Sequence, residues 1–462
     1  MHRGAALARS ARSVAIPQTA IGRFLSGMVV PLGTVSYSEG VTMRFTTTRK
    51  FRCAMPEAVI VATARSPIGR AGKGSLKDMR PDDLAAHIVG AALGKVPELN
   101  PKDVKDLMLG CGLPGGEQGS NLGRTVAVML GYDHLPGVTV TRYCASSLQT
   151  TRMAFHAIRS GEGDVFISAG VETVSRFSKG TSDFIPGQDL SNPFFRGAQS
   201  RTSERSEAGA LMWRDPREDS EVPDIYIAMG QTAENVQQVI GMSREEQDLF
   251  AVRSQNLAEA QIASGFWARE ITPVTLPDGS IVSHDDGPRP GVTLEAVSQL
   301  QPVFRPDGTV TAGNACALND GAAALVVMSD LKAKDLGLVP LARIVSTSVT
   351  AMSPEVMGLA PVTAIPAALA NAGMKLEDID LFEINEAFAV QALGSAQRLG
   401  IPLDSLNVNG GAIAVGHPFG MTGARITTTL INSLQWHDKQ FGVESMCVAG
   451  GMGMAMVIER LS

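Results

Sequence analysis

Short apolar segments alternate with amphipathic segments along this chain, from about residue 56 to its end. The apolar segments are rich in β-branched residues, as buried strands are, whereas the amphipathic ones repeat apolar residues every three or four positions, as helices do. The pattern predicts strands over Val59–Thr63, Leu107–Cys111, Val138–Thr141, Val165–Ala169 and Leu381–Ile384, and helices over Asp82–Leu93 and Cys144–Ser160. Because strands and helices alternate, the predicted fold class is α/β.

Residues 176–301 interrupt this alternation. The stretch is polar, contains Pro and Trp, and predicts two helices, near Ile227–Ile240 and Arg244–Gly265. We interpret it as a loop lobe inserted into the first of two α/β halves. The expected domains are an N-terminal half of residues 55–175 and 302–330, the inserted lobe of residues 176–301, and a C-terminal half of residues 331–462.

The second half repeats the first in short segments. KDVKDLMLGC at residues 102–111 matches EDIDLFEIN at 377–385, and GDVFISAG at 163–170 matches ESMCVAGG at 444–451. Likewise, a strand leads to Cys144 in the first half, and Leu406–Asn409 leads through a longer glycine-rich loop to His417 in the second. The duplication therefore places four residues at the ends of equivalent strands, where α/β sheets bind ligands: Cys144, Asn385, His417 and Cys447.

Cys144 lies where a buried strand is predicted to pass into a helix. Backbone N–H groups and the positive end of the helix dipole favour the thiolate there, and the thiolate is the form of cysteine that attacks a carbonyl carbon. A buried cysteine also serves simply as a small core residue. Asn385 and His417 also have purely structural interpretations. Asn385 could be a helix N-cap, and His417 could be a loop residue whose ring nitrogens are hydrogen-bonded. The residue types alone leave these alternatives open.

The composition narrows the class of protein. A chain of 462 residues, 19% charged and 44% hydrophobic, is expected to form two or three soluble globular domains. Its five cysteines, at positions 53, 111, 144, 316 and 447, include no CxxC pair, which indicates reduced thiols rather than a disulfide framework or a zinc site. No apolar run is long enough to cross a membrane.

Charge is unevenly distributed along the chain. Residues 1–54 hold eight Lys or Arg and one Glu, which leaves 32 basic and 45 acidic residues in the remainder, a net charge of −13. Because residues 55–462 carry this negative charge, general binding of nucleic acids is excluded. The leading segment, which we expect to be disordered, is typical of an organelle transit peptide. The other interpretation is a start codon assigned too early, with Met55 as the true start. The predicted compartment is the cytoplasm, or the mitochondrion if the leader is a transit peptide.

Five ordered motifs resemble those of the thiolase family: CASSLQ, TAGNACALNDGAAA, NEAFA, NGGAIAVGHPFGMTGAR and CVAGGMGMAM. MGQTAENV and SREEQDLFAVRSQ, inside the inserted lobe, are similar to thiolase segments as well. The resemblance covers the chain from Met55 to its end. It implies two duplicated βαβαβαββ halves forming a five-layered αβαβα core, and a homodimer or homotetramer. It also implies CoA as a co-substrate, with no permanently bound cofactor and no metal.

The resemblance also implies a reaction. Thiolases cleave a 3-ketoacyl-CoA with CoA to acetyl-CoA and a shortened acyl-CoA, or run the reverse Claisen condensation, by a ping-pong mechanism through an acyl-cysteine. Cys144 matches the nucleophile, and His417 matches the base that takes its proton. Cys447 matches the second cysteine, which protonates the enolate. Asn385 matches the residue whose bound water, together with the histidine, stabilises the enolate oxygen. The backbone N–H groups of Cys144 and residue 449 would form a second oxyanion hole.

Two positions depart from the family pattern. Residue 449 is Ala, where the family usually has Gly, so a methyl group is added beside the site. Cys316 stands where many relatives carry a Ser that contacts the pantetheine arm of CoA. Because a thiol is a weaker hydrogen-bonding group than a hydroxyl, Cys316 is a candidate CoA contact only by position.

Three alternatives remain at this stage. A decarboxylating ketosynthase shares the fold and the nucleophile but lacks the second cysteine, so Cys447 argues against it. A catalytically silent CoA-binding subunit would usually have lost a reactive residue. Within the thiolases, fatty acid β-oxidation is favoured, with a hydratase/dehydrogenase enzyme as a candidate partner. The other role is that of an acetoacetyl-CoA-forming acetyl-CoA C-acetyltransferase.

Overall fold

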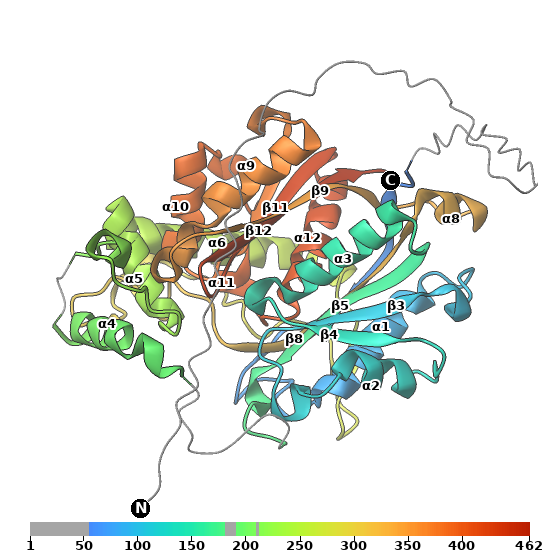
Figure 1. The fold of residues 1–462 in the computed structure, drawn as a ribbon, viewed down its shortest axis with the longest axis horizontal. Coiled ribbons are helices and arrows are strands. Elements are labelled where there is room, and N and C mark those ends of the chain that lie inside the picture. Colours follow the sequence, from blue (N-terminus) through green and yellow to red (C-terminus); the bar gives the residue numbers. More distant parts are fainter. Residues whose placement is uncertain (1–54, 181–190, 209–211) are drawn as a thin grey trace, which may run out of the picture. The chain divides into compact units, whose positions relative to one another are not determined.

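The computed structural model describes residues 55–180, 191–208 and 212–462 (Figure 1), and the predictions for residues 1–54 lie outside these ranges. The strands of the described ranges are β1 (Ala58–Arg65), β2 (Gly69–Arg70), β3 (Asp106–Cys111), β4 (Gly137–Val140), β5 (Val165–Thr173), β6 (Val274–Thr275), β7 (Ile281–Val282), β8 (Asn319–Ser329), β9 (Ala342–Ala351), β10 (Leu381–Ile384), β11 (Phe441–Val448) and β12 (Met452–Arg460). Their α-helices are α1 (Pro81–Gly94), α2 (Leu122–Met129), α3 (Ser146–Ser160), α4 (Arg196–Ala208), α5 (Met229–Ile240), α6 (Arg244–Ala263), α7 (Leu294–Ser298), α8 (Asp330–Asp335), α9 (Pro361–Ala372), α10 (Ala389–Leu399), α11 (Ala412–Val415) and α12 (Thr422–Trp436).

The main sheet consists of two copies of one strand arrangement. The strands follow the order β10-β11-β12-β9-β1-β8-β5-β3-β4, with β2 beside β8. In the first half, β3 is parallel to β4 and β5, while β8 is antiparallel to β5 and β1. In the second half, β10 is parallel to β11, while β12 is antiparallel to β11 and β9. An isolated parallel bridge from Leu406 to Phe382 takes the place of β4. The duplication predicted from the sequence is confirmed.

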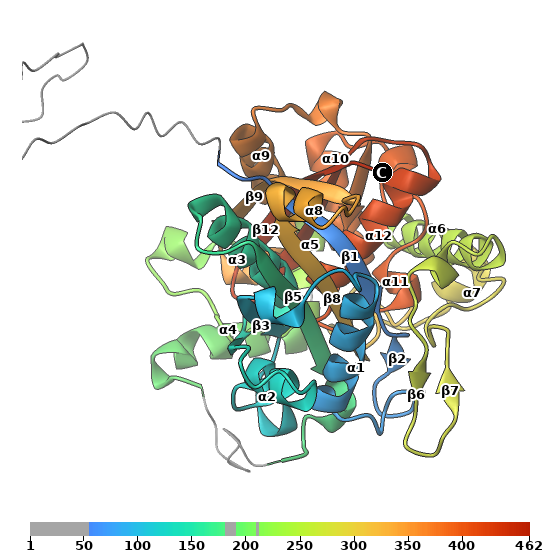
Figure 2. The ribbon, with the colours of Figure 1, turned by 90° about the vertical axis from the view of Figure 1, so that its right-hand side faces the viewer.

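The helices form three layers around the two halves of the sheet. On the outer side of the first half lie α1 and α2, and α9 covers the outer side of the second half with α10 beside it. Between the halves, α3 and α12 pack against one another and against strands of both (Figures 1 and 2). The resulting order is the five-layered αβαβα core that the motifs implied, and the halves also join edge to edge where β1 pairs with β9.

Strand β8 shows why the core strands are almost continuously apolar. Its side chains alternate between two apolar clusters. Ala322, Ala324, Val326 and Met328 belong to the cluster under α1, and Ala323, Leu325 and Val327 belong to the cluster around α3 and α12. Because helices cover both faces, the stretch from Gly321 to Met328 carries no polar side chain, as is typical of buried sheets, and the polar residues of β8 stand at its two ends.

Two sequence predictions near Cys144 were wrong. The strand predicted as buried is β4, which lies at the edge of the sheet and is half-buried throughout, because only β3 pairs with it. The following α-helix begins at Ser146, not at Cys144. Cys144 lies instead in the 3₁₀ turn Tyr143–Ala145, whose first residue, Tyr143, has a left-handed backbone conformation with φ of 44°.

The segment between β5 and β8 carries helices α4 to α7 and the small hairpin of β6 and β7. Within it, α5 and α6 contact α10, and α6 also contacts α11. The segment therefore packs against the loops that follow β10 and precede α12. The domain boundaries drawn from the sequence remain a prediction. Within the described ranges, no helix combines the length and apolar character that crossing a membrane requires.

Candidate active site

The predicted site residues come from four separate segments of the two halves. Cys144 lies in the turn after β4, Asn385 directly follows β10, His417 lies between α11 and α12, and Cys447 belongs to β11. All four are buried, with Cys144 8% and His417 1% exposed. The thiols of Cys144, Cys316 and Cys447 lie close enough that the charge of one raises the pKa of another. The fold therefore gathers the three cysteines in one place.

The turn that carries Cys144 is held by a serine. The Ser146 hydroxyl accepts a hydrogen bond from the backbone N–H of Arg142 at 2.9 Å and donates one to the carbonyl of Tyr143 at 2.6 Å. The start of α3 lies against Gly110 of β3, where a Cβ would come within 2.5 Å of the backbone at Ser146. This close approach explains the glycine and fixes the position of Cys144.

Burial dominates the ionisation of Cys144. It raises the pKa of the thiol to about 12, while backbone N–H groups of Ala449 and of Cys144 itself lower it. The backbone donors do favour the thiolate, as expected, but desolvation outweighs them, so Cys144 is a neutral thiol near pH 7. The same two donors are the ones predicted for an oxyanion hole, and both are directed at the Cys144 sulfur.

His417 is held by hydrogen bonds on both its backbone and its ring. Its backbone N–H donates to Asn319 Oδ1 at 2.9 Å, and its Nδ1 lies 2.6 Å from Thr422 Oγ1. The Thr422 hydroxyl also donates to the Pro418 carbonyl at 2.7 Å. A hydroxyl has one hydrogen and a carbonyl has none, so Nδ1 carries the ring proton and donates to Thr422. The lone pair is then on Nε2.

That lone pair is available for catalysis. Among the described residues, Nε2 of His417 is buried and has no hydrogen-bond partner. Burial, together with the positive charge of Arg425, lowers the pKa of His417 to about 3, so the imidazole is neutral near pH 7. A neutral histidine with a free Nε2 can accept a proton from a thiol that meets it.

Replacing Thr422 by valine is expected to reduce kcat, because it removes the group that holds the proton on Nδ1. Free to exchange tautomers, the ring would present a protonated Nε2 part of the time. The expected loss is roughly tenfold or more, within the ~10²–10⁴-fold that a general base contributes. Steady-state kinetics of Thr422→Val and Thr422→Ser test this, since the serine variant keeps the hydroxyl and should retain most of the activity. Equal losses in both variants would contradict the assignment.

Asn385 presents a free amide donor. Its Oδ1 accepts a hydrogen bond from Arg425 Nη2 at 3.4 Å, and because a guanidinium only donates, this contact fixes which way the amide points. Among the described residues, its Nδ2 is buried without a partner. The following helix α10 begins at Ala389 with Phe388 as its N-cap, so the N-cap interpretation of Asn385 was wrong.

Two buried glutamates that sequence reasoning missed hold the loops of the site. Glu386 accepts hydrogen bonds from Ser254, Asn407 and the Ile413 N–H, and so ties the end of β10 to the glycine-rich loop. Glu172 accepts from the N–H groups of Gly112 and Gly420 and from Gln118 Nε2, and so ties the loop after β3 to the loop before α12. An acid inside an otherwise apolar strand, as in GVET, was the available signal.

A cavity of about 330 Å³ is lined by the inserted lobe and by the glycine-rich loop just before His417. Its walls include Arg70, Arg289, Asn319 and Gly416, the residue before His417, together with Ala315 and Ala317. Cys316, between these two alanines, is half-buried, and its N–H donates to the Ala387 carbonyl at 3.1 Å. Arg70 donates from Nη2 to the Gly287 carbonyl at 3.2 Å, and neither arginine forms an ion pair with a described carboxylate.

The comparisons with known proteins all point to one family. Residues 58–331 match the family described as thiolase, N-terminal domain, and residues 338–460 match thiolase, C-terminal domain. The chain is 41% identical over 418 residues to a 3-ketoacyl-CoA thiolase of Bacillus subtilis (strain 168), and 39% identical over 414 residues to a β-ketoadipyl-CoA thiolase of Acinetobacter baylyi. Each match covers 88% of this chain and 100% of the relative.

Two solved structures resemble the fold of this chain with nearly equal TM-scores. The crystal structure of the Bacillus anthracis acetyl-CoA acetyltransferase gives a TM-score of 0.76 at 39% identity, over 88% of this chain and 99% of the other. The dimeric peroxisomal thiolase of Saccharomyces cerevisiae gives 0.77 at 35% identity, over 88% and 97%.

Proposed function

Because this chain belongs to the thiolase family, we propose that it cleaves 3-ketoacyl-CoA esters with CoA, giving acetyl-CoA and a shortened acyl-CoA, in the degradative direction of fatty acid β-oxidation. One observation carries the proposal. Two buried thiols, Cys144 and Cys447, and a neutral histidine with a free Nε2 are supplied to the site by the two duplicated halves. A silent CoA-binding subunit would have no need of these groups.

In the first half-reaction, Cys144 attacks the ketone carbon as its proton passes to Nε2 of His417. The N–H groups of Ala449 and Cys144, already directed at the sulfur, are placed to stabilise the oxyanion of the tetrahedral intermediate. The C–C bond then breaks and its electron pair enters the enolate of acetyl-CoA. The free Nδ2 of Asn385, through a water, and His417 stabilise the enolate oxygen. The Cys447 thiol gives its proton to the enolate carbon and becomes a thiolate.

The second half-reaction returns both protons. The CoA thiol loses its proton to the Cys447 thiolate and attacks the acyl thioester on Cys144. The departing Cys144 sulfur regains its proton from the His417 imidazolium. Both cysteines and the histidine thus end the cycle as they began it, and no permanently bound cofactor or metal takes part. Covalent catalysis of this kind splits one difficult acyl transfer into two easier steps.

The cavity lined by Arg70 and Arg289 supports CoA as the co-substrate. Its arginines suit phosphate groups, and its lining includes Gly416, the residue before His417. An extended CoA entering there would bring its thiol past Cys316 towards Cys144. We propose that the assembly is a homodimer or homotetramer, as the dimeric yeast thiolase suggests. The cytoplasm is the proposed compartment, because the four described cysteines are all free thiols.

CoA-dependent cleavage of acetoacetyl-CoA and of medium- and long-chain 3-ketoacyl-CoA by the full chain tests the proposal. We expect cleavage of the longer substrates at rates equal to or above that of acetoacetyl-CoA. Activity confined to acetoacetyl-CoA would instead assign an acetyl-CoA C-acetyltransferase, as the Bacillus anthracis relative is named. No cleavage by the folded protein would assign a silent CoA-binding subunit. Malonyl-CoA is the control, and it should not be decarboxylated.

A further inference from the structure

Arg425 is a buried cation that the catalytic steps above do not use. It ends the glycine-rich motif that carries His417, and it lies near the start of α12, between the two halves of the sheet (Figures 1 and 2). Its Nη2 donates to Asn385 Oδ1 at 3.4 Å, while its Nε and Nη1 are buried and have no hydrogen-bond partner among the described residues. Because arginine keeps its proton in proteins, this guanidinium is a positive charge with few partners.

The other buried arginines of the described ranges are better satisfied. Arg65 donates to two buried carboxylates. Arg305 donates from Nε to Gln231 Oε1 at 2.8 Å and from Nη2 to Asn235 Oδ1 at 2.7 Å. By contrast, no carboxylate within the described ranges forms an ion pair with Arg425. Burying an unpaired charge is costly, so a guanidinium kept in this state beside the site points to a role in its chemistry.

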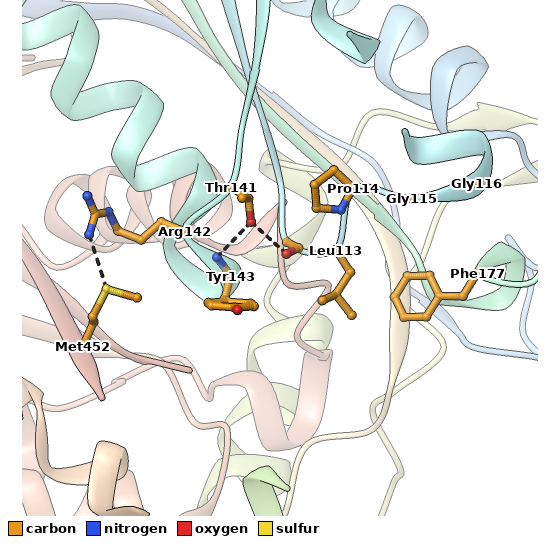
Figure 3. Close-up of a pocket in the computed structure, with 10 residues that line it drawn as sticks. Leu113, Pro114, Gly115, Gly116, Thr141, Arg142, Tyr143, Phe177 and Met452 are labelled. Atoms are coloured by element: carbon orange, nitrogen blue, oxygen red, sulfur yellow. Dashed lines mark hydrogen bonds between the residues drawn. The ribbon is translucent and has the colours of Figure 1, made fainter. Parts of the chain in front are cut away.

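Arg142, which precedes the turn of Cys144, shows the usual way in which such a charge is accommodated. It also lacks a carboxylate partner, but it lines a cavity of about 740 Å³, where water can reach it. Its Nε donates to Gln149 Oε1 at 3.0 Å, and its Nη1 donates to Met452 Sδ at 3.5 Å, the second contact being drawn in Figure 3. Arg425 does not line this cavity and is 1% exposed, so bulk solvent screens Arg142 and not Arg425.

Two buried glutamates lie near Arg425 without neutralising it. Glu383 of β10 and Glu444 of β11 stand side by side in the parallel register of these strands. Burial raises the pKa of each to about 8, and the charge of Arg425 acts in the opposite direction, so both carboxyl groups are mostly protonated at pH 7. Much of the positive charge of the guanidinium therefore stays uncompensated beside Asn385.

We propose that Arg425 is a positioning residue of the enolate-forming step, which holds Nδ2 of Asn385 towards the enolate and strengthens that donor through its own positive charge. The inference rests on the proposed function and deepens it. The enolate oxygen acquires its negative charge only as the C–C bond breaks, so a fixed cation in a water-excluded site favours that state over the bound ketone. A hydrogen bond to the amide oxygen also polarises the amide and makes its N–H a stronger donor.

Two reactions of the full-length protein distinguish this role from a structural one. Cleavage of acetoacetyl-CoA with CoA passes through the enolate, whereas acetylation of Cys144 by acetyl-CoA, followed by intact mass, does not. Arg425→Met is expected to lower kcat for cleavage roughly tenfold, less than the ~10²–10³-fold that loss of an oxyanion-hole donor costs. The acetylation rate should stay near that of the wild type, because burial, the larger cause of its low pKa, still keeps His417 neutral. Arg425→Lys keeps the charge without the planar fork and should give a smaller loss.

A double-mutant cycle tests whether Arg425 acts through Asn385. In the Asn385→Ala background, Arg425→Met should slow cleavage no further, because the amide that it orients is gone. Arg305→Met is the matched control, since it also removes a buried arginine bonded to side-chain amides. It should change cleavage and acetylation by the same factor. If Arg425→Met does not fold, Arg425→Lys replaces it in the cycle.

The outcomes separate this inference from the proposed function. If the wild type does not cleave acetoacetyl-CoA, the proposed function fails and the inference with it. If the wild type cleaves it, equal losses of cleavage and acetylation in the Arg425 variants would make the residue structural and overturn the inference. An unchanged cleavage rate in these variants, or losses that multiply in the double variant, would overturn it as well. A loss confined to cleavage and absent from the Asn385→Ala background supports it.

Discussion

Replacing Cys447 by alanine is expected to abolish turnover while leaving acylation of Cys144 intact. Cleavage of the C–C bond needs a proton for the enolate carbon, and in the proposed mechanism Cys447 supplies it. Thioester exchange between acetyl-CoA and Cys144 forms no carbanion, and the CoA that leaves is stable as a thiolate even without a proton from Cys447, so the exchange can proceed with His417 and the N–H groups at the sulfur. We expect kcat to fall at least ~10³-fold, within the range for loss of a general acid. Intact mass after incubation with acetyl-CoA should still show one acetyl group.

Two further variants make that result decisive. Cys144→Ala should lose both turnover and acetylation, because it removes the nucleophile itself. Cys111→Ala removes a thiol that is equally buried, on β3, and should keep both activities. Near-normal turnover in Cys447→Ala would remove that residue from the mechanism. Acetylation of Cys144→Ala would show that another residue carries the acyl group.

Much of the fold was predictable because its signals are local. The central strands are buried on both faces and so consist of apolar residues, as in β8, and the amphipathic helices carry their own periodicity. Repeated segments indicated the duplication, and the structure shows it in the pairing of the strands. The two-residue strands β6 and β7 have too few positions for any period to be read.

The sequence motifs propose the members of the candidate site, but they do not predict the ionisation of those residues. The motifs identified Cys144 and His417, but their ionisation depends on burial, which tertiary packing decides. In Cys144 burial reverses the effect expected from the start of a helix. Likewise, no pattern in the sequence assigns Thr422 to the ring of His417, or Glu172 to two loops that lie far apart along the chain. Such contacts follow only when distant segments meet.

The ionisation of the Cys144–His417 pair leads to a distinctive pH dependence. In the wild type, alkylation of Cys144 by iodoacetamide is expected to be independent of pH between about 5 and about 9. The thiol pKa is raised to about 12 and the imidazole pKa is lowered to about 3, so both groups stay neutral across this range. The reacting species is then the neutral pair, with His417 taking the proton as the sulfur attacks.

Without the histidine, only the thiolate can react. For a pKa near 12, the thiolate fraction rises tenfold with each pH unit below that value. We therefore expect the alkylation rate of Cys144 in His417→Asn to rise tenfold per unit over the same range and, at pH 7, to lie ~10²–10⁴-fold below that of the wild type. Peptide mass mapping assigns the modification to Cys144 rather than to Cys316 or Cys447.

The matched control is His437→Asn. His437 is exposed at the end of α12, and its Nε2 bonds to Asn409 Oδ1 at 3.2 Å. Removing it should leave the flat profile unchanged, because it contacts none of the site cysteines. A wild-type rate that already rises tenfold per unit would mean that His417 does not take the thiol proton. A flat profile in His417→Asn would place the base elsewhere.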